Sequence, residues 1–130
     1  MGSESPGAFD VAVQSDPPFD AVIHTASPFL YKAISNNLEF LDPAIKGTSE
    51  ILKSIKAHAP SVKRVVITSS CAAVVNFAGN PFASPQKVYT EDDWNPTTWE
   101  AALTGTQNTA YQASKKFAEK AGKLGDADEQ

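Results

Sequence analysis

The stretch Val65-Val66-Ile67-Thr68-Ser69 decides the fold that this sequence predicts. Its β-branched side chains favour an extended chain, because they fit a pleated sheet better than a helix. A similar run, Asp20-Ala-Val-Ile-His-Thr-Ala-Ser27, lies upstream and ends at Pro28. Short apolar runs bounded by turn residues are typical of strands that are covered on both faces. We therefore predict two buried strands.

The segment between the two strands predicts one long helix. Asp42-Pro43 suits a helix start, because an acidic cap and a first-turn proline both match the unpaired N–H groups there. Residues at helical spacing follow and stop before Pro60; they are Ile45, Thr48, Leu52 and Ile55. A strand, a crossover helix and a second strand make a βαβ unit, whose strands run parallel. The predicted fold class is α/β.

The outer parts of the chain predict less regular structure. Residues 1–7 are rich in Gly, Ser and Pro and predict a loose end, and residues 9–13 predict a short helix. Irregular chain is expected over residues 74–95, followed by a short helix over residues 97–103. The clearest helical pattern covers residues 109–124, with an apolar stripe formed by Ala113, Phe117 and Ala121.

Composition limits the class of function. With 130 residues, of which 42% are hydrophobic and 20% charged, the chain suits one globular core and is short for two domains. A net charge of -4 without a basic block argues against a nucleic-acid partner. No apolar run approaches the roughly 18 residues that cross a bilayer, and the N-terminus has no signal-peptide pattern. The single cysteine, Cys71, suits a reducing compartment, so we expect a cytoplasmic protein.

Tyr111-Gln-Ala-Ser-Lys115 is the first motif that carries chemistry. Residues four positions apart lie on one face of a helix, so the phenol and the ammonium can address the same small volume. Reduction of a carbonyl uses such a pair, because negative charge grows on the oxygen and a nearby acid must supply a proton. A neighbouring cation favours the ionised phenol. The same spacing also arises by chance, so the motif is weak without further support.

Two further elements follow the predicted strands, at the edge where open parallel sheets bind ligands. Ser70, within Thr68-Ser-Ser-Cys-Ala-Ala73, could donate to a carbonyl oxygen, or it could bond its own backbone as loop-start serines usually do. After the first strand, small residues would let a flat cofactor approach the backbone; they are Thr25, Ala26 and Ser27.

A metal centre and a cysteine nucleophile are both unsupported by the sequence. The two histidines, His24 and His58, have no Cys/His cluster around them in the sequence. A lone histidine that leaves a strand is more often structural than catalytic, so His24 is interpreted as structural. Cys71 would need a neighbouring base to act as a nucleophile, and we expect a packed thiol instead.

Together these segments resemble the extended short-chain dehydrogenase/reductases, in the branch of dihydroflavonol reductases, methylglyoxal reductase and fungal ketoreductases. The resemblance covers residues 9–124 and rests on four stretches, which are Asp20 to Phe29, Asp42 to Thr48, Val65 to Ser70 and Tyr111 to Lys115. It implies a Rossmann-like parallel sheet with crossover helices. It also implies reduction of an aldehyde or ketone to an alcohol with NADP or NAD as the cofactor.

The resemblance implies roles for individual residues. Tyr111 would give its proton to the substrate oxygen, while Lys115 would favour the ionised tyrosine and hydrogen-bond the nicotinamide ribose. Ser70 would orient the carbonyl group. The residues that would line the cofactor are Thr25, Ala26 and Ser27, together with Tyr111 and Lys115.

The sequence departs from the family pattern at the loop that binds the nucleotide phosphates. Complete members carry Gly-x-x-Gly-x-x-Gly before a helix whose N-terminus holds the pyrophosphate. The seven glycines of this sequence do not have that spacing. We therefore expect residues 1–130 to be the middle portion of an NAD(P)-binding Rossmann domain, without a second domain. Dinucleotide binding should be weakened, and activity weak or absent.

Two other hypotheses remain open. A non-catalytic fragment could bind a partner or associate with itself through exposed sheet edges, which invite pairing with another chain. A nucleotide-sugar epimerase or dehydratase shares the Tyr/Lys pair, although Ser27-Pro28-Phe29 and Asp42-Pro43 favour the reductase branch. Under the reductase hypothesis the partner is a small-molecule carbonyl substrate, with no membrane and no nucleic acid.

Overall fold

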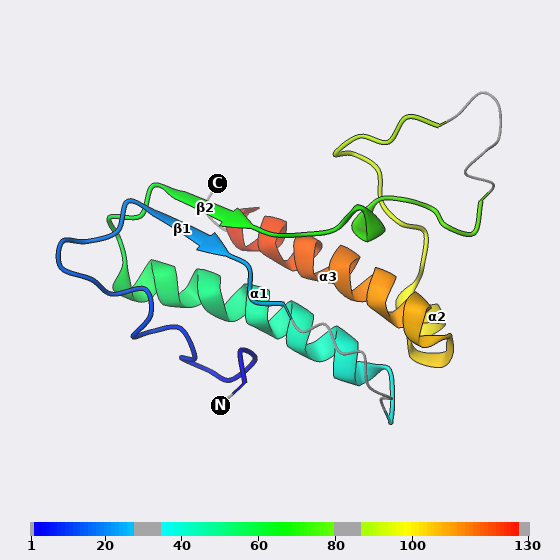
Figure 1. The fold of residues 1–130 in the computed structure, drawn as a ribbon, viewed down its shortest axis with the longest axis horizontal. Helices are drawn as coiled ribbons and strands as arrows, with labels where there is room; N and C mark the ends of the chain where they lie inside the picture. Colours follow the sequence, from blue (N-terminus) through cyan, green and yellow to red (C-terminus); the bar gives the residue numbers. More distant parts are fainter. Residues whose placement is uncertain (1, 28–34, 80–86, 128–130) are drawn as a thin grey trace.

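A computed structural model of the chain describes residues 2–27, 35–79 and 87–127 (Figure 1). The elements follow in the order β1 (Ala21–His24), α1 (Leu38–His58), β2 (Arg64–Ile67), the 3-10 turn η1 (Cys71–Ala73), α2 (Trp99–Thr104) and α3 (Gln107–Ala127). Figure 1 shows α1 and α3 side by side on one face of the two strands. A small sheet therefore rests on a pair of long helices.

The two strands pair in parallel, with Val22 opposite Val65 and His24 opposite Ile67. This pairing confirms the predicted βαβ unit, in which α1 is the crossover helix. Parallel strands joined by a crossover end at the same edge of the sheet. β1 ends at His24, three residues before the predicted end at Ser27, and Pro28 lies outside the described residues.

Within the described part of the chain, helices cover one face of the sheet, so the prediction of strands buried on both faces is wrong. Val22 and Val65 pack against a core cluster formed by Val13, Ile51, Ile55 and Ala59. The alternate side chains point to the other face, because successive residues of a strand do so. There Ile23 is 71% exposed and Val66 is 47% exposed.

α1 begins at Leu38, a turn earlier than the predicted start at Asp42-Pro43. The Asn36 side chain accepts a hydrogen bond from the Leu38 N–H at 3.0 Å. This bond satisfies one of the N–H groups that a helix start leaves unpaired, so the helix can begin before the proline. Pro43 consequently lies inside α1, which ends before Pro60 as predicted.

The N-terminal segment is docked on α1, although a loose end was predicted for it. The Gly7 N–H donates to the Glu50 carboxylate at 3.3 Å, and the Ser54 hydroxyl donates to Asp10 at 2.6 Å. Residues 9–13 form turns in place of the predicted short helix. These contacts with α1 set the path of the segment, and they override its weak local preference for a helix.

α2 and α3 lie close to the predicted ranges 97–103 and 109–124. A second core cluster joins them to α1 and consists of Leu41, Ala102 and Ala113. Trp99 from α2 and Phe117 from α3 pack against this cluster, with their ring centroids 5.4 Å apart. The position of α3 is thus fixed by apolar contacts with both other helices.

Leu41 is fully buried where the three helices meet, so Leu41→Ala should lower the free energy of unfolding by about 2–5 kcal/mol. Leu38→Ala in the same helix is the matched control. Leu38 is 43% exposed, and its truncation should cost less than about 1 kcal/mol. Urea unfolding followed by circular dichroism measures both changes, and equal losses at the two positions would contradict this packing.

Candidate active site

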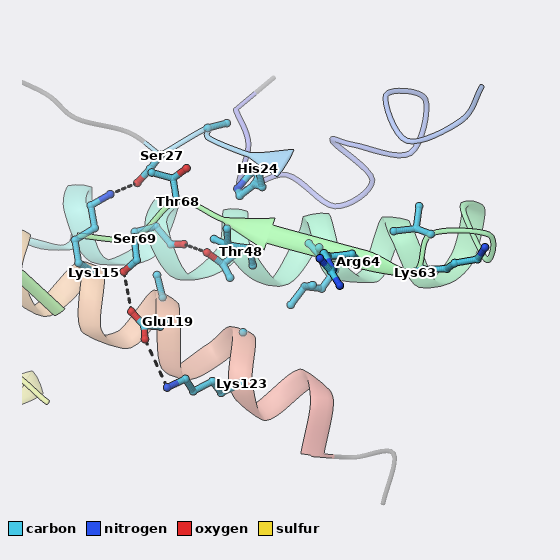
Figure 2. Close-up of a pocket in the computed structure, with 18 residues that line it drawn as sticks. His24, Ser27, Thr48, Lys63, Arg64, Thr68, Ser69, Lys115, Glu119 and Lys123 are labelled. Atoms are coloured by element: carbon cyan, nitrogen blue, oxygen red, sulfur yellow. Dashed lines mark hydrogen bonds and ion pairs between the residues drawn. The ribbon is translucent and has the colours of Figure 1, made fainter. Parts of the chain in front are cut away.

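A cavity of about 560 Å³ opens where β1 and β2 end. Open parallel sheets bind ligands at this edge. The walls come from β2 and the residues on either side of it, the end of β1 and the chain after it, α1 and α3, and they include Ser27, Ser69 and Lys115. Figure 2 shows these three residues at one end of the cavity and Lys63 at the other, where β2 begins. The volume is in the range of cavities that hold small organic ligands.

The ammonium group of Lys115 is the central charge of this cavity. Lys115 is 9% exposed, and its Nζ donates to Ser27 Oγ at 2.6 Å. The lysine comes from α3 and the serine from the chain after β1, so the bond joins segments far apart in the sequence. Burial disfavours the charged form and lowers the pKa of Lys115 from its ordinary value of 10.5. The structure thus brings together two of the predicted cofactor residues.

Tyr111 lies one turn before Lys115 on α3, with its ring centroid 5.6 Å from Lys115 Nζ. Phe40 of α1 packs edge-to-face with the tyrosine ring, at a centroid distance of 6.3 Å. These contacts hold the half-buried ring in one place and put a cation beside it. The Lys115 ammonium thus lies over the tyrosine ring, while Tyr111 stands beside the cavity and is not part of its wall.

Ser70 caps the η1 turn that follows β2. Its Oγ accepts from the Ala72 N–H at 3.2 Å, so the structural alternative for this serine is realised. A hydroxyl that accepts one hydrogen bond keeps its own proton to donate, so capping is compatible with a contact to a carbonyl oxygen. The preceding hydroxyl, on Ser69, donates to the Glu119 carboxylate at 2.8 Å.

The three small residues after β1 do not share one surface. Ser27 and Ala26 line the main cavity, whereas Thr25 lines a second cavity of about 330 Å³ beside Phe9. Ala26 borders both cavities. The three residues that were predicted to line the cofactor are therefore divided between two cavities, and Ser27 is the one bonded to Lys115.

Two side chains that were predicted to be structural have different surroundings. His24 is 7% exposed, and its ring meets that of Phe9 edge-to-face at 5.3 Å. Burial lowers the pKa of His24 from 6.5, which favours the neutral ring and a packing role. Cys71 is exposed, so the prediction of a packed thiol is wrong. The η1 turn buries Ala72 and Ala73 instead and leaves its first residue at the surface.

Glu119 and Lys123 also line the cavity, although neither was predicted to do so. Lys123 Nζ lies 3.6 Å from Glu119, which in turn accepts from Ser69 (Figure 2). Both residues continue the four-residue spacing of Tyr111 and Lys115 along α3. Because residues four apart share a helix face, this spacing was the signal that could have identified them.

Among residues 2–27, 35–79 and 87–127, no three His, Cys, Asp or Glu side chains gather closely enough to hold a metal ion. No helix in the described part of the chain is long and apolar enough to cross a bilayer. The charged groups that line the main cavity are the side chains of Lys63, Arg64, Lys115, Glu119 and Lys123.

The sequence is similar to reductases from fungi. It is 48% identical over 115 residues to a ketoreductase of Aspergillus niger, which covers 88% of this chain and 32% of the relative. It is 48% identical over 101 residues to the NADPH-dependent methylglyoxal reductase of Saccharomyces cerevisiae, which covers 77% of this chain and 29% of the relative. The chain thus spans about one third of the length of the curated relatives it matches. No protein-family model matches it.

The fold is shared with a solved reductase. The crystal structure of yeast methylglyoxal/isovaleraldehyde reductase complexed with NADPH matches this chain with a TM-score of 0.82 and 41% sequence identity. The match covers 95% of this chain and 36% of that structure. It confirms the predicted Rossmann-like α/β fold.

The burial of Lys115 predicts an ammonium that titrates below 10.5, which side-chain nitrogen-15 NMR would measure. Between the folded pKa and 10.5 the unfolded chain holds more protons, so the free energy of unfolding should rise with pH in that range. Ser27→Ala should lower the midpoint further, because the charged form loses its hydrogen-bond acceptor. A wild-type midpoint at or above 10.5 would contradict this description of the ammonium.

Proposed function

We propose that this chain, which is homologous to a segment of the NADPH-dependent reductases in the extended short-chain dehydrogenase/reductase branch, serves the reduction of an aldehyde or ketone to an alcohol. The observation that carries the proposal is the buried Lys115 ammonium, which is bonded to Ser27 and lies beside the Tyr111 ring. A phenol with a neighbouring cation suits the delivery of a proton to an oxygen that gains negative charge.

The residues of the main cavity fit the nicotinamide-ribose end of NADPH. Ser27 and Lys115, 2.6 Å apart, offer a hydroxyl and an ammonium to the hydroxyl groups of a sugar. Further along the cavity, phosphate groups would meet the positive side chains of Lys63, Arg64 and Lys123. The oriented backbone amides of a Gly-x-x-Gly-x-x-Gly turn are not supplied by these 130 residues, so we expect them to bind the cofactor weakly by themselves.

Three side chains have separate roles in the proposed reaction. NADPH, when bound, supplies the hydride to the carbonyl carbon. Ser70 donates a hydrogen bond to the carbonyl oxygen and holds it toward Tyr111. As negative charge grows on that oxygen, the Tyr111 phenol gives it a proton and the alcohol forms. The Lys115 ammonium stabilises the phenolate that remains.

The proposal extends to the compartment in which the protein works. Cys71 is exposed on the η1 turn, directly after the proposed Ser70. An exposed thiol in an oxidising compartment is open to disulfide exchange, whereas the cytoplasm keeps thiols reduced. We therefore propose that the protein works in the cytoplasm.

Tyr111→Phe removes the proposed proton donor and keeps the ring that packs on Phe40. The kcat should fall by about 10²- to 10⁴-fold while the fold is retained. The assay follows oxidation of NADPH by a panel of aldehydes and ketones, with protein made from the complete reading frame. Tyr89→Phe is the matched control and should leave kcat unchanged, because Tyr89 bonds the Asn76 N–H and does not line the cavity.

Two outcomes of this assay would overturn the proposal. The first is a wild-type protein that oxidises NADPH with no carbonyl of the panel. The second is turnover of a nucleotide sugar without net consumption of NADPH, which would favour an epimerase or dehydratase. Equal kcat values for wild type and Tyr111→Phe would remove Tyr111 from the proposed mechanism.

A second proposal, of a different class, is that the chain associates with another copy of itself through its sheet. Ile23 and Val66 are the exposed apolar side chains on the face away from α1 and α3. Within the described residues each strand pairs only with the other, so both outer edges present unpaired N–H and C=O groups. Exposed edges and exposed apolar side chains both favour association between chains.

This association should appear as a concentration-dependent mass in size-exclusion chromatography with light scattering. Ile23→Lys combined with Val66→Lys should shift the protein toward a monomer, because charge on the uncovered face opposes stacking. Val88→Lys is the control, since Val88 is 82% exposed and lies outside the sheet. A wild-type monomer at all concentrations would rule this proposal out.

A further inference from the structure

Asn95 is a buried polar residue that has no role in the mechanism proposed above. It is 1% exposed and lies between η1 and α2. Its amide nitrogen donates to the Val75 carbonyl at 2.8 Å and to Gln112 Oε1 at 3.1 Å, and its Oδ1 accepts from the Thr97 N–H at 2.9 Å. Its backbone N–H donates to the Ala73 carbonyl at 2.8 Å. Both side-chain N–H groups and the side-chain oxygen are thus in use.

These hydrogen bonds connect two parts of the proposed site, one on the η1 turn and one on α3. The Ala73 and Val75 carbonyls belong to the η1 turn and the residues just after it, and Ser70 caps that turn. Gln112 is the residue after Tyr111 on α3. Asn95 therefore bridges the turn that holds the proposed carbonyl-orienting hydroxyl and the helix that holds the proposed proton donor.

We propose that Asn95 is a positioning residue, which fixes the Ser70 hydroxyl relative to the Tyr111 phenol. This inference rests on the proposed function above. The carbonyl oxygen accepts a hydrogen bond from Ser70 and a proton from Tyr111, so the rate of its reduction depends on the distance between these two groups. An error of about 1 Å in that distance can lower the rate about a hundredfold. Ser70 and Tyr111 touch the substrate, whereas Asn95 acts through them.

Lys116 provides an internal comparison for Asn95. Its Nζ donates to the Thr97 carbonyl at 2.8 Å, so it also ties this segment to α3. Lys116 is 8% exposed and is therefore buried as well. Its bond reaches the Thr97 carbonyl, whereas the bonds of Asn95 also reach the carbonyls of Ala73 and Val75. Both residues thus connect the segment before α2 to α3. Only Asn95 of the two also bonds the η1 turn and the residues just after it.

The kinetic test compares Asn95→Ala, Gln112→Ala and Lys116→Met in the NADPH oxidation assay. Asn95→Ala and Gln112→Ala should lower kcat by roughly tenfold to a hundredfold and leave the KM for NADPH within about twofold, because Ser27 and Lys115 keep their positions. Lys116→Met should retain kcat even where it lowers the free energy of unfolding. Gln112→Ala removes one hydrogen bond, so it remains informative if Asn95→Ala does not fold.

A second measurement does not depend on turnover. In the η1 turn the Ala73 N–H donates to Ser70 O and the Val75 N–H donates to Cys71 O, each at 2.9 Å. Amide hydrogen exchange at Ala73 and Val75 should accelerate at least about tenfold in Asn95→Ala, because the Val75 carbonyl loses its side-chain partner and only the backbone bond to the Ala73 carbonyl remains. The same amides should keep their wild-type rates in Lys116→Met, which is a variant of comparable burial.

The two measurements separate the possible failures. Wild-type kcat in Asn95→Ala, or wild-type exchange at both amides, would overturn the positioning role. A fall in stability with kcat unchanged would make Asn95 merely structural and would also overturn it. If the wild-type protein oxidises no NADPH, the proposed function fails, and the exchange rates then decide whether Asn95 holds the turn.

Discussion

The parallel pairing of β1 with β2 is the constraint on which the rest of the structure depends. Because α1 crosses from one strand to the other, both strands end at the same edge of the sheet. Ser27 after β1 and Ser70 after β2 therefore arrive at that edge although α1 separates them in the sequence. α3 packs along α1 and brings Lys115 to the same place. The parallel pairing of the strands therefore brings residues of three separate segments together in the proposed site.

The buried ammonium of Lys115 sets the electrostatics of this edge. An ammonium carries three protons, and among the described residues Ser27 Oγ is the acceptor within hydrogen-bonding distance. Burial of a charge with one neutral partner costs free energy, which is the reason that the pKa of Lys115 is lowered. A ligand with hydroxyl groups would supply further acceptors, so binding at this edge should also stabilise the fold.

Local patterns of the sequence predicted the βαβ unit and the Tyr111–Lys115 pair, because each depends on periodicity within one element. The predictions were wrong where contacts between residues far apart in the sequence determine the structure. The docking of the N-terminal segment depends on Gly7 meeting Glu50, and no local pattern contains that contact. The uncovered face was mispredicted because an apolar run favours a strand without indicating how many of its faces are covered. Cys71 was mispredicted because the burial of a turn residue depends on which way the turn faces.

Asn95 shows why irregular segments hide such information most completely. An asparagine in a loop has no periodic signal, and its importance comes from partners at three other places in the sequence. An apolar side chain of the same size would fill the volume and leave the Val75 carbonyl and the Thr97 N–H unpaired, which costs more than the apolar contact returns. The burial of this polar group therefore selects one arrangement of the loop, and through the loop one placement of the turn after β2 against α3.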